Sequence, residues 1–310
     1  CVSRITYLFA EKLLKRKLKG TMKKKLMLEV ANLLPLSPST INSYLNNRAF
    51  WLCRKVYKLP TGSQANFEWG NSVEWCIKDN FPQMVKRHPE IIDKGKITHK
   101  STIQKIHRNY SYRLNKNGIS KEDGKKYIET LVPMVEMGIH KLKQYGRIVS
   151  YQDKLKFNIP VLIEGEEYKI PMIGYTDFLM EHKSGTRRLV DIKCTSKFPS
   201  KDEETKLIKE SSVGFSNKLQ QILYSRATNY QTDLLFIGHT KKGGAKADKF
   251  TVQNDPKFIT IASQAIISME MMLRMVTNIK DLKYYILPSP EDYQWHNNVN
   301  RESRKEVWGW

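Results

Sequence analysis

Apolar residues recur every three or four positions in the first half of the chain, the spacing of an amphipathic helix. The clearest stripe lies within residues 120–145 and consists of Ile128, Leu131, Val135, Ile139 and Leu142. Gly146 follows the stripe directly, and glycine is the residue that most often ends a helix. The pattern therefore predicts one long helix over 120–145.

Shorter helical segments are predicted before it. Ser37 or Ser39 can cap a helix, because either hydroxyl can accept a hydrogen bond from a free backbone N–H of the first turn. A second helix is expected over 67–79 and should stop before Pro82, since proline lacks the donor that a helix interior needs. Residues 82–118 are interpreted as irregular, basic helical pieces.

After residue 146 the apolar period changes from about 3.6 to 2, which is typical of strands with one buried face. Strands are predicted at 147–159, 168–181, 187–195, 232–239 and 247–253, with a turn at 164–166 and helices at 214–230 and 256–279. The order of elements predicts an α/β fold with a central mixed sheet flanked by helices and a helical N-terminal part. The expected boundaries are an N-terminal extension at 1–28, a main domain at 29–290 and a tail at 291–310.

The net charge of the chain indicates what kind of partner it binds. The chain has 53 Lys and Arg against 31 Asp and Glu, a formal net charge of +22. Residues 1–25 hold nine basic residues and one acidic residue, so the rest of the chain still carries +14. Such an excess favours a polyanionic partner, most commonly nucleic acid; a lysine-rich composition that merely aids solubility is the alternative.

The basic N-terminal extension has two interpretations. It is either an arm that contacts a polyanion or upstream sequence foreign to the natural protein, which would then begin at Met22 or Met27. The second is favoured, because the chain starts at Cys1 and its short apolar stretch, 5–10, is followed at once by charged residues.

Cysteine usage and hydropathy exclude several classes. The cysteines are scattered and form no Cys-x-x-Cys pair, which argues against a zinc knuckle or a disulfide framework and favours the cytoplasm, in a bacterial or phage-infected cell; they are Cys1, Cys53, Cys76 and Cys194. No apolar run approaches the roughly 20 residues of a membrane span, so no membrane is expected. Residues 241–246 lack the Gly-Lys-Ser/Thr of a phosphate-binding loop, so no ATP is expected.

Charged residues stand among apolar ones on two predicted strands. Asp191 and Lys193 share one face, because side chains alternate along a strand. A hairpin folded about Ser184 places Asp177 opposite Asp191, since each lies seven positions from the turn. Facing carboxylates repel unless a cation lies between them, and such hard oxygen ligands suit Mg²⁺ or Mn²⁺. Lys193 would then orient or activate a metal-bound water. An ordinary exposed Asp–Lys hairpin is the alternative.

These residues resemble a known signature. Asp177, followed after a hairpin by Asp191-Ile192-Lys193, resembles the PD-(D/E)XK nucleases, and in particular their RecB-like exonuclease branch, which includes phage and mitochondrial genome maintenance exonucleases. That branch has a Gly-x-x-x-His motif whose histidine contributes to the metal site. Residues 70–74 stand in its place, with Glu74 where the branch has histidine.

Two further motifs support the resemblance. Gln220 and Tyr224 match a Gln-x-x-x-Tyr motif that lies near DNA in the family, with Gln221 as the alternative if the register slips by one. Residues 37–45 resemble the family's opening Ser-x-Ser-x-Ile helix. The match therefore spans about residues 37 to 240.

The resemblance implies a restriction-endonuclease-like fold and a metal-dependent DNA exonuclease acting in recombination, repair or phage DNA processing. The implied metal ligands are Glu74, Asp177, Asp191 and the Ile192 carbonyl, and the implied catalytic set is Glu74, Asp177, Asp191 and Lys193. The DNA contacts expected with them are Ser39, Thr195, Lys197, Gln220 and Tyr224. The substrate would be single strands or duplex ends, with a recombination or single-strand-binding protein as a partner.

Some properties of the family are not expected here, and two other functions stay open. Several relatives hold an iron–sulfur cluster on one early and three late cysteines, whereas no cysteine follows Cys194, so no such cluster is expected. A nucleic-acid-binding module that has lost its chemistry, or an endonuclease on the same fold, would share most of these residues. The intact Asp177, Asp191 and Lys193 favour an active enzyme.

Overall fold

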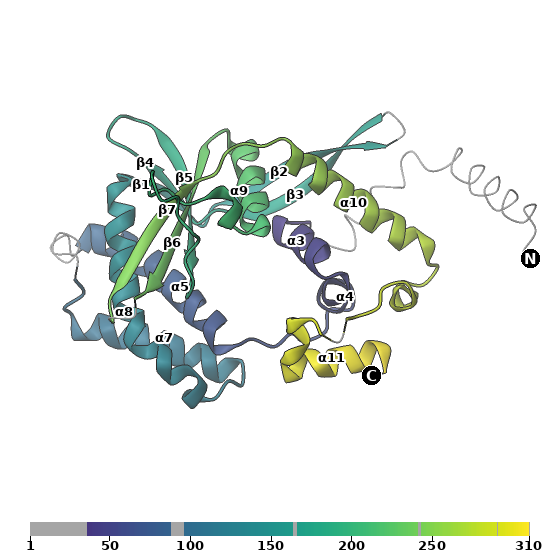
Figure 1. Cartoon of the computed structure of the whole chain (residues 1–310), viewed down its shortest axis with the longest axis horizontal. Coiled ribbons are helices and arrows are strands. Elements are labelled where there is room, and N and C mark those ends of the chain that lie inside the picture. The colour runs from purple at the N-terminus through teal and green to yellow at the C-terminus, as the bar shows by residue number, and fades with distance from the viewer. Residues whose placement is uncertain (1–35, 88–95, 164–165, 241–242, 290, 310) are drawn as a thin grey trace, which may run out of the picture. The chain divides into compact units, whose positions relative to one another are not determined.

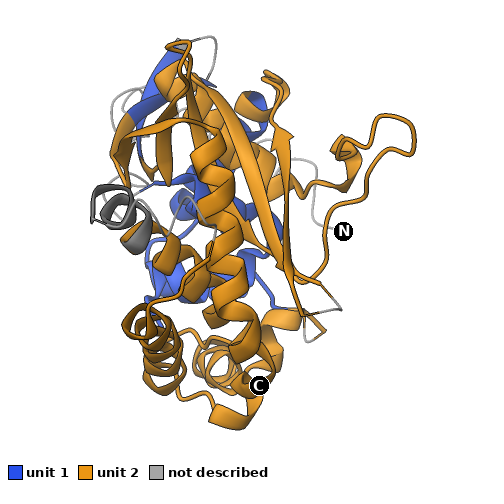
Figure 2. Cartoon of the chain, turned by 90° about the vertical axis from the view of Figure 1, so that its left-hand side faces the viewer, with its two compact units in different colours: residues 1–59, 157–173, 260–288 blue, residues 60–156, 174–259, 289–310 orange. Residues whose placement is uncertain are grey.

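The computed structural model describes residues 36–87, 96–163, 166–240, 243–289 and 291–309 (Figure 1). The predicted N-terminal extension lies outside these residues, as do residues 164–165 of the predicted turn at 164–166. The chain divides into two compact units (Figure 2). Unit 1 holds the described residues up to 59, with 157–173 and 260–288, and unit 2 holds 60–156, 174–259 and 289–310. The predicted domain boundaries at residues 28 and 290 stay a prediction.

Unit 1 is built from helices and most of a two-stranded sheet. Its elements are α3 (Pro38–Asn46), α4 (Arg48–Trp51), the π-helical η1 (Leu52–Val56), most of β2 (Lys154–Ile163), β3 (Glu166–Tyr175) and α10 (Lys257–Met275), and the 3-10 helix η3 (Ile279–Tyr284). Ser37 caps α3, because its Oγ accepts a hydrogen bond from Thr40 N at 3.2 Å. Tyr44 of α3 lies with its hydroxyl 2.6 Å from Ser268 Oγ, which fixes α3 against α10.

Helix α10 meets the length and composition of a membrane span, contrary to the expectation that no apolar run comes close to one. In its most apolar 18-residue window, 44% of the residues are buried inside the structure. A buried core helix has the same composition, so this property alone decides nothing about a membrane.

Unit 2 contains a five-stranded sheet in the order β1-β4-β5-β6-β7. Its strands are β1 (Arg147–Tyr151), β4 (Phe178–Glu181), β5 (Arg187–Cys194), β6 (Gln231–His239) and β7 (Ala245–Thr251). Strands β5 and β6 run parallel, and the other neighbouring pairs are antiparallel. The predicted α/β class with a central mixed sheet is confirmed.

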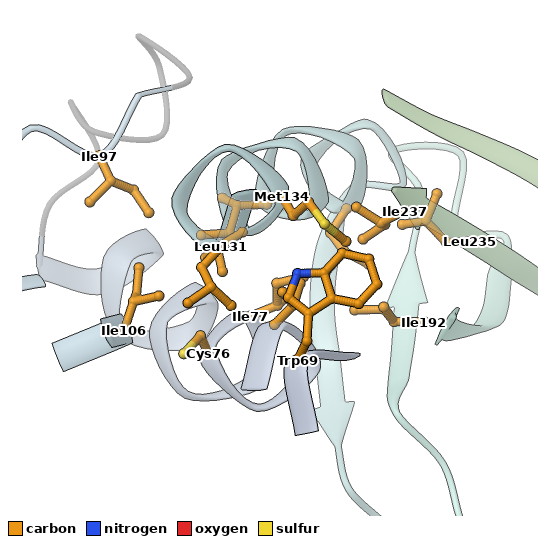
Figure 3. Packing of buried hydrophobic residues seen from close by; sticks show 14 of the residues in the cluster. Trp69, Cys76, Ile77, Ile97, Ile106, Leu131, Met134, Ile192, Leu235 and Ile237 are labelled. Carbon is orange, nitrogen blue, oxygen red and sulfur yellow. The ribbon is translucent and has the colours of Figure 1, made fainter. Parts of the chain in front are cut away.

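Helices cover both faces of this sheet. On one face, α5 (Ala65–Arg87), α7 (Lys100–Lys116) and α8 (Lys121–Gln144) share one apolar core with the strands (Figure 3). That core includes Trp69, Cys76, Ile77, Leu131, Met134, Ile192, Leu235 and Ile237. On the other face, α9 (Phe215–Thr228) contacts β6, where Thr232 Oγ1 donates to Gln221 O at 3.5 Å. Asp191 pairs with Leu234 and Lys193 with Phe236 in the ladder, so both charged side chains belong to the α9 face.

Four predicted boundaries are wrong. Helix α5 continues past Pro82 to residue 87, because the proline removes one backbone hydrogen bond without ending the helix. Residues 100–116 form one regular helix rather than irregular pieces. The predicted strand at 147–159 breaks at Gln152, which has a left-handed φ of 53°. The predicted strand at 168–181 breaks at residues 176–177, between β3 and β4.

The C-terminal residues expected as a tail are folded into η4 (Tyr293–His296) and α11 (Asn298–Trp308). Gly62 N donates to Asn300 Oδ1 at 2.8 Å, and Ser303 Oγ donates to Pro60 O at 2.7 Å. These bonds hold α11 on the segment that leads into α5.

Candidate active site

The β4–β5 hairpin has the register that the sequence predicts. Phe178 pairs with Val190 and Leu179 with Leu189, so every pair is symmetric about residue 184. Extending this register by one position places Asp177 opposite Asp191. Asp177 itself lies in the break before β4, where its carbonyl accepts a hydrogen bond from Gln152 N at 3.0 Å.

Asp177 is buried, with 9% of its surface exposed, and both of its carboxylate oxygens have partners. Oδ2 accepts a hydrogen bond from Ile192 N at 2.9 Å, and Oδ1 lies 2.7 Å from Lys78 Nζ. The hydrogen bond from Ile192 N joins the segment between β3 and β4 to the centre of β5, next to Asp191. The contact with Lys78 joins the same segment to α5. The expected role of the Ile192 carbonyl stays a prediction.

Asp191 and Lys193 form an ion pair on β5, with 2.6 Å between Oδ2 and Nζ. The Asp191 side chain is 5% exposed, so this ion pair is largely shielded from solvent on the side of the carboxylate. Burial raises the pKa of Asp191 to about 7 against the lowering effect of Lys193, and Asp177 and Glu74 raise it further.

Lys193 keeps its proton. Burial alone would lower the pKa of this ammonium, but Asp191, then Asp177 and Glu74, outweigh burial and raise it. A protonated lysine can donate hydrogen bonds and stabilise negative charge, but it cannot accept a proton.

Helix α5 contributes a face on which Gly70, Glu74 and Lys78 follow one another at intervals of four. A Cβ at Gly70 would lie 3.3 Å from the Cys194 Cβ, so this glycine lets α5 approach β5 closely. Burial raises the pKa of Glu74 and Asp177 adds to the effect, while Lys78 lowers it.

Lys78 is the residue of the site that the sequence analysis missed. Its ammonium pairs with both Glu74 and Asp177, and its side chain is 10% exposed. Burial would lower the pKa of Lys78, but the two carboxylates outweigh burial and raise it. Its spacing from Glu74 is the one signal in the sequence that marks it, since i and i+4 share a helix face.

The site thus combines three carboxylates (Glu74, Asp177, Asp191) with two ammonium groups (Lys78, Lys193). Within the described ranges, no three His, Cys, Asp or Glu side chains are arranged to hold a metal ion. The donor chemistry nevertheless fits Mg²⁺ or Mn²⁺, because all three acids supply hard carboxylate oxygens. Such an ion would have to displace the Lys78 ammonium from between Glu74 and Asp177.

Gln220 and Tyr224 lie one turn apart on α9, and Gln220 Nε2 donates to the Tyr224 hydroxyl at 3.3 Å. The same hydroxyl accepts from Tyr175 N at 3.3 Å, close to Asp177 in the chain. Gln221, the alternative in the shifted register, is 1% exposed and belongs to the core. Gly174 is a second missed signal, because a Cβ there would lie 2.4 Å from the Tyr224 ring.

The other expected DNA contacts are more scattered. Thr195 and Lys197 lie just after β5, where Thr195 Oγ1 donates to the Lys197 carbonyl at 2.6 Å and Lys197 is exposed. Ser39 is exposed and belongs to unit 1, with its Oγ 2.9 Å from Ser37 Oγ. The structure therefore brings together Glu74, Asp177, Asp191 and Lys193 within unit 2, while the DNA contacts stay a prediction.

A separate cavity of about 550 Å³ lies on the α8 side of the sheet. Its lining includes Tyr145, Arg188 and the fully buried Asp233, which lies 3.3 Å from the Arg188 guanidinium. None of the predicted site residues lines it. Val190 pairs with Asp233, so this cavity belongs to the face of β5 opposite Asp191 and Lys193.

Comparison with known proteins adds little to this geometry. No family model matches the chain, and no curated protein matches it significantly. Among solved structures, it is similar to a "putative exonuclease" from Eubacterium rectale at 14% identity and a TM-score of 0.45, covering 90% of this chain and 94% of that one. It is also similar to a protein named SSO0001 at 11% identity and a TM-score of 0.29, covering 69% and 95%. Likeness at this level assigns no role to any residue.

Proposed function

We propose that this chain is a metal-dependent DNA nuclease of the PD-(D/E)XK class, in its RecB-like exonuclease branch. The observation that carries the proposal is the linked set in unit 2, in which Asp177 contacts both the backbone of β5 beside Asp191 and the ammonium beside Glu74. Two buried carboxylates and the partly exposed Glu74 belong to this set, on a chain whose net charge of +22 favours a polyanionic substrate.

Each residue of the site has a separate role in the proposed cleavage of a phosphodiester bond. A bound Mg²⁺ or Mn²⁺ would neutralise charge on the scissile phosphate and lower the pKa of a water. Asp177 and Asp191, with Glu74, would hold that ion through carboxylate oxygens. Lys193 donates an N–H to the attacking water or to a phosphate oxygen and stabilises the negative charge that grows there. Because its pKa is raised, Lys193 orients the water rather than taking its proton.

Gln220 supplies the nearby polar surface for the DNA strand, and the buried Tyr224 hydroxyl accepts a hydrogen bond from its amide. Burial raises the pKa of Tyr224, so its hydroxyl stays neutral. The proposed setting is the cytoplasm, in recombination, repair or phage DNA processing, and the proposed substrate is a DNA end.

The test is digestion of end-labelled linear and circular DNA by the full chain with Mg²⁺, Mn²⁺ or EDTA. Cleavage of linear DNA from its ends with either metal, and none with EDTA, is expected. Asp191→Asn keeps the shape but removes a charged ligand, and it should slow cleavage by several powers of ten, since each ~1.4 kcal/mol is a factor of ten. Equal cleavage rates for the variant and the parent would refute the assignment of the active site. If the parent binds DNA but does not cleave it, the alternative of an inactive nucleic-acid-binding module would be favoured.

A further inference from the structure

Lys78 has an unusual position for a lysine. Its side chain is 10% exposed and its ammonium lies between two carboxylates, those of Glu74 and Asp177. Lysine is almost never so deeply buried unless it is paired. Lys193, by contrast, contacts one carboxylate and has a side chain that is 26% exposed. The two ammonium groups therefore have different surroundings.

We propose, on the basis of the proposed function, that Lys78 is a built-in counter-ion that competes with the divalent metal for Glu74 and Asp177. The ammonium holds these carboxylates together when no metal is bound. A metal ion enters only as the ammonium withdraws, so Lys78 sets how much metal the site requires. Lys78 is a positioning residue in this scheme, because it acts on the carboxylates and not on the DNA.

The charges of the described site support this competition. When all three carboxylates are ionised, they and the two ammonium groups sum to a net charge of −1. Addition of a divalent ion to these five groups changes the net charge of the site to +1. Without Lys78 the net charge would be −2 before the ion binds and zero afterwards. The attraction for a divalent ion is therefore stronger without the Lys78 charge.

The contacts of Lys78 also explain how the metal-free site is held. Glu74 and Lys78 belong to α5, whereas Asp177 lies between β3 and β4, so the ammonium joins a helix to the break in the strands. Without a positive charge, the partly exposed Glu74 carboxylate and the buried Asp177 carboxylate would repel across this junction. Removal of Lys78 should therefore weaken the metal-free fold and strengthen metal binding at the same time. A lysine with a purely structural role would weaken the fold without strengthening metal binding.

Calorimetric titration of the metal-free full chain with MnCl₂ tests the proposal. Lys78→Met should bind Mn²⁺ at least about tenfold more tightly than the parent, since a unit charge roughly 4 Å away acts through an effective dielectric constant of about 20. Its melting temperature should fall in EDTA and recover with Mn²⁺. Lys105→Met is the matched control, because Lys105 pairs with Asp79 and is more exposed; its Mn²⁺ affinity should equal that of the parent. Equal or weaker Mn²⁺ binding by Lys78→Met would overturn the proposal.

A second pair of variants keeps the test decisive if Lys78→Met does not fold. Glu74→Gln lowers the negative charge of the site, and Glu74→Gln/Lys78→Met restores the net charge of the parent without the buried pair. The double variant should bind Mn²⁺ about tenfold more tightly than Glu74→Gln; no difference between them would contradict the competition. The titration does not depend on cleavage, so failure of the DNA digestion alone would refute the nuclease and leave the competition standing.

Discussion

Asp191 links the site to the stability of the fold through pH. Its pKa is about 7 in the folded chain, against an ordinary value of 3.8, because burial disfavours the charged form. A raised pKa contributes stability below the unfolded value, and that stability is lost as the pH rises toward the folded value. Glu74 acts in the same direction, since burial also raises its pKa. The metal-free protein should therefore lose stability between about pH 4 and pH 7.

The matching measurement is thermal melting in EDTA across this range, for the parent and Asp191→Asn. Asparagine cannot ionise, so the variant should gain in melting temperature relative to the parent as the pH rises. The slopes of melting temperature against pH are compared, because an effect of the lost carboxylate partner of Lys193 that is the same at every pH does not change the slope. Parallel slopes would show that Asp191 does not titrate abnormally.

Substitution of Lys193 should affect the rate of cleavage in a different way from substitution of Asp191. Lys193→Ala removes a donor that acts on the reacting water or phosphate, so it should reduce kcat by at least about a hundredfold. DNA affinity should change little, because the interaction develops in the transition state. Mn²⁺ affinity should rise, because the ammonium that leaves lies 2.6 Å from Asp191 Oδ2. Calorimetry and single-turnover cleavage would separate these effects. A variant that loses binding and keeps its single-turnover rate would assign Lys193 to substrate binding.

Between elements of unit 2, Gly174 at the end of β3 lies directly against Tyr224 of α9. A Cβ at position 174 would lie 2.4 Å from the Tyr224 ring, so Gly174→Ala forces the ring or α9 to move. Overpacking of this kind typically costs about 1–3 kcal/mol, and here it should also disturb the Gln220–Tyr224 bond.

Urea unfolding and cleavage assays would measure the two consequences of Gly174→Ala. Gly244→Ala is the control, because its nearest atom would lie 3.5 Å away, an ordinary contact distance. Equal unfolding midpoints for the two variants would show that α9 accommodates the methyl group freely.

Elements that depend on local pattern were predictable, and elements that depend on distant contacts were not. The stripe of 120–145 and the symmetry of the hairpin about Ser184 follow from short-range spacing, and the structure confirms both. Pro82 misled the helix prediction, because a proline removes one backbone hydrogen bond but does not always end a helix; α8 likewise continues through Pro133. Lys78 could be placed beside Glu74 from spacing, but its contact with Asp177 arises only when α5 meets the strands.

For the molecule as a whole, the net charge of +22 predicts salt-sensitive DNA binding. The logarithm of the affinity should fall linearly with the logarithm of salt, as counterions leave the DNA. Lys197 is exposed just beyond β5, so Lys197→Ala should weaken binding to all sequences alike and reduce the slope by about 1. Fluorescence anisotropy at several salt concentrations would measure the slope, and Lys197→Arg should retain it. An affinity independent of salt would exclude an electrostatic contact with the phosphates.

The bonds between α11 and the segment before α5 have a consequence for synthesis on the ribosome. Gly62 and Asn300 are 238 positions apart, and Pro60 and Ser303 are 243 apart. Unit 2 therefore cannot close until residue 303 has left the exit tunnel, although its sheet is complete at residue 251. Contacts so distant along the chain slow folding, because a long loop must be ordered before they form. The nascent chain thus carries the carboxylate cluster on a finished sheet for some fifty residues before its last helix docks, an interval in which chaperones would have access to the open segment.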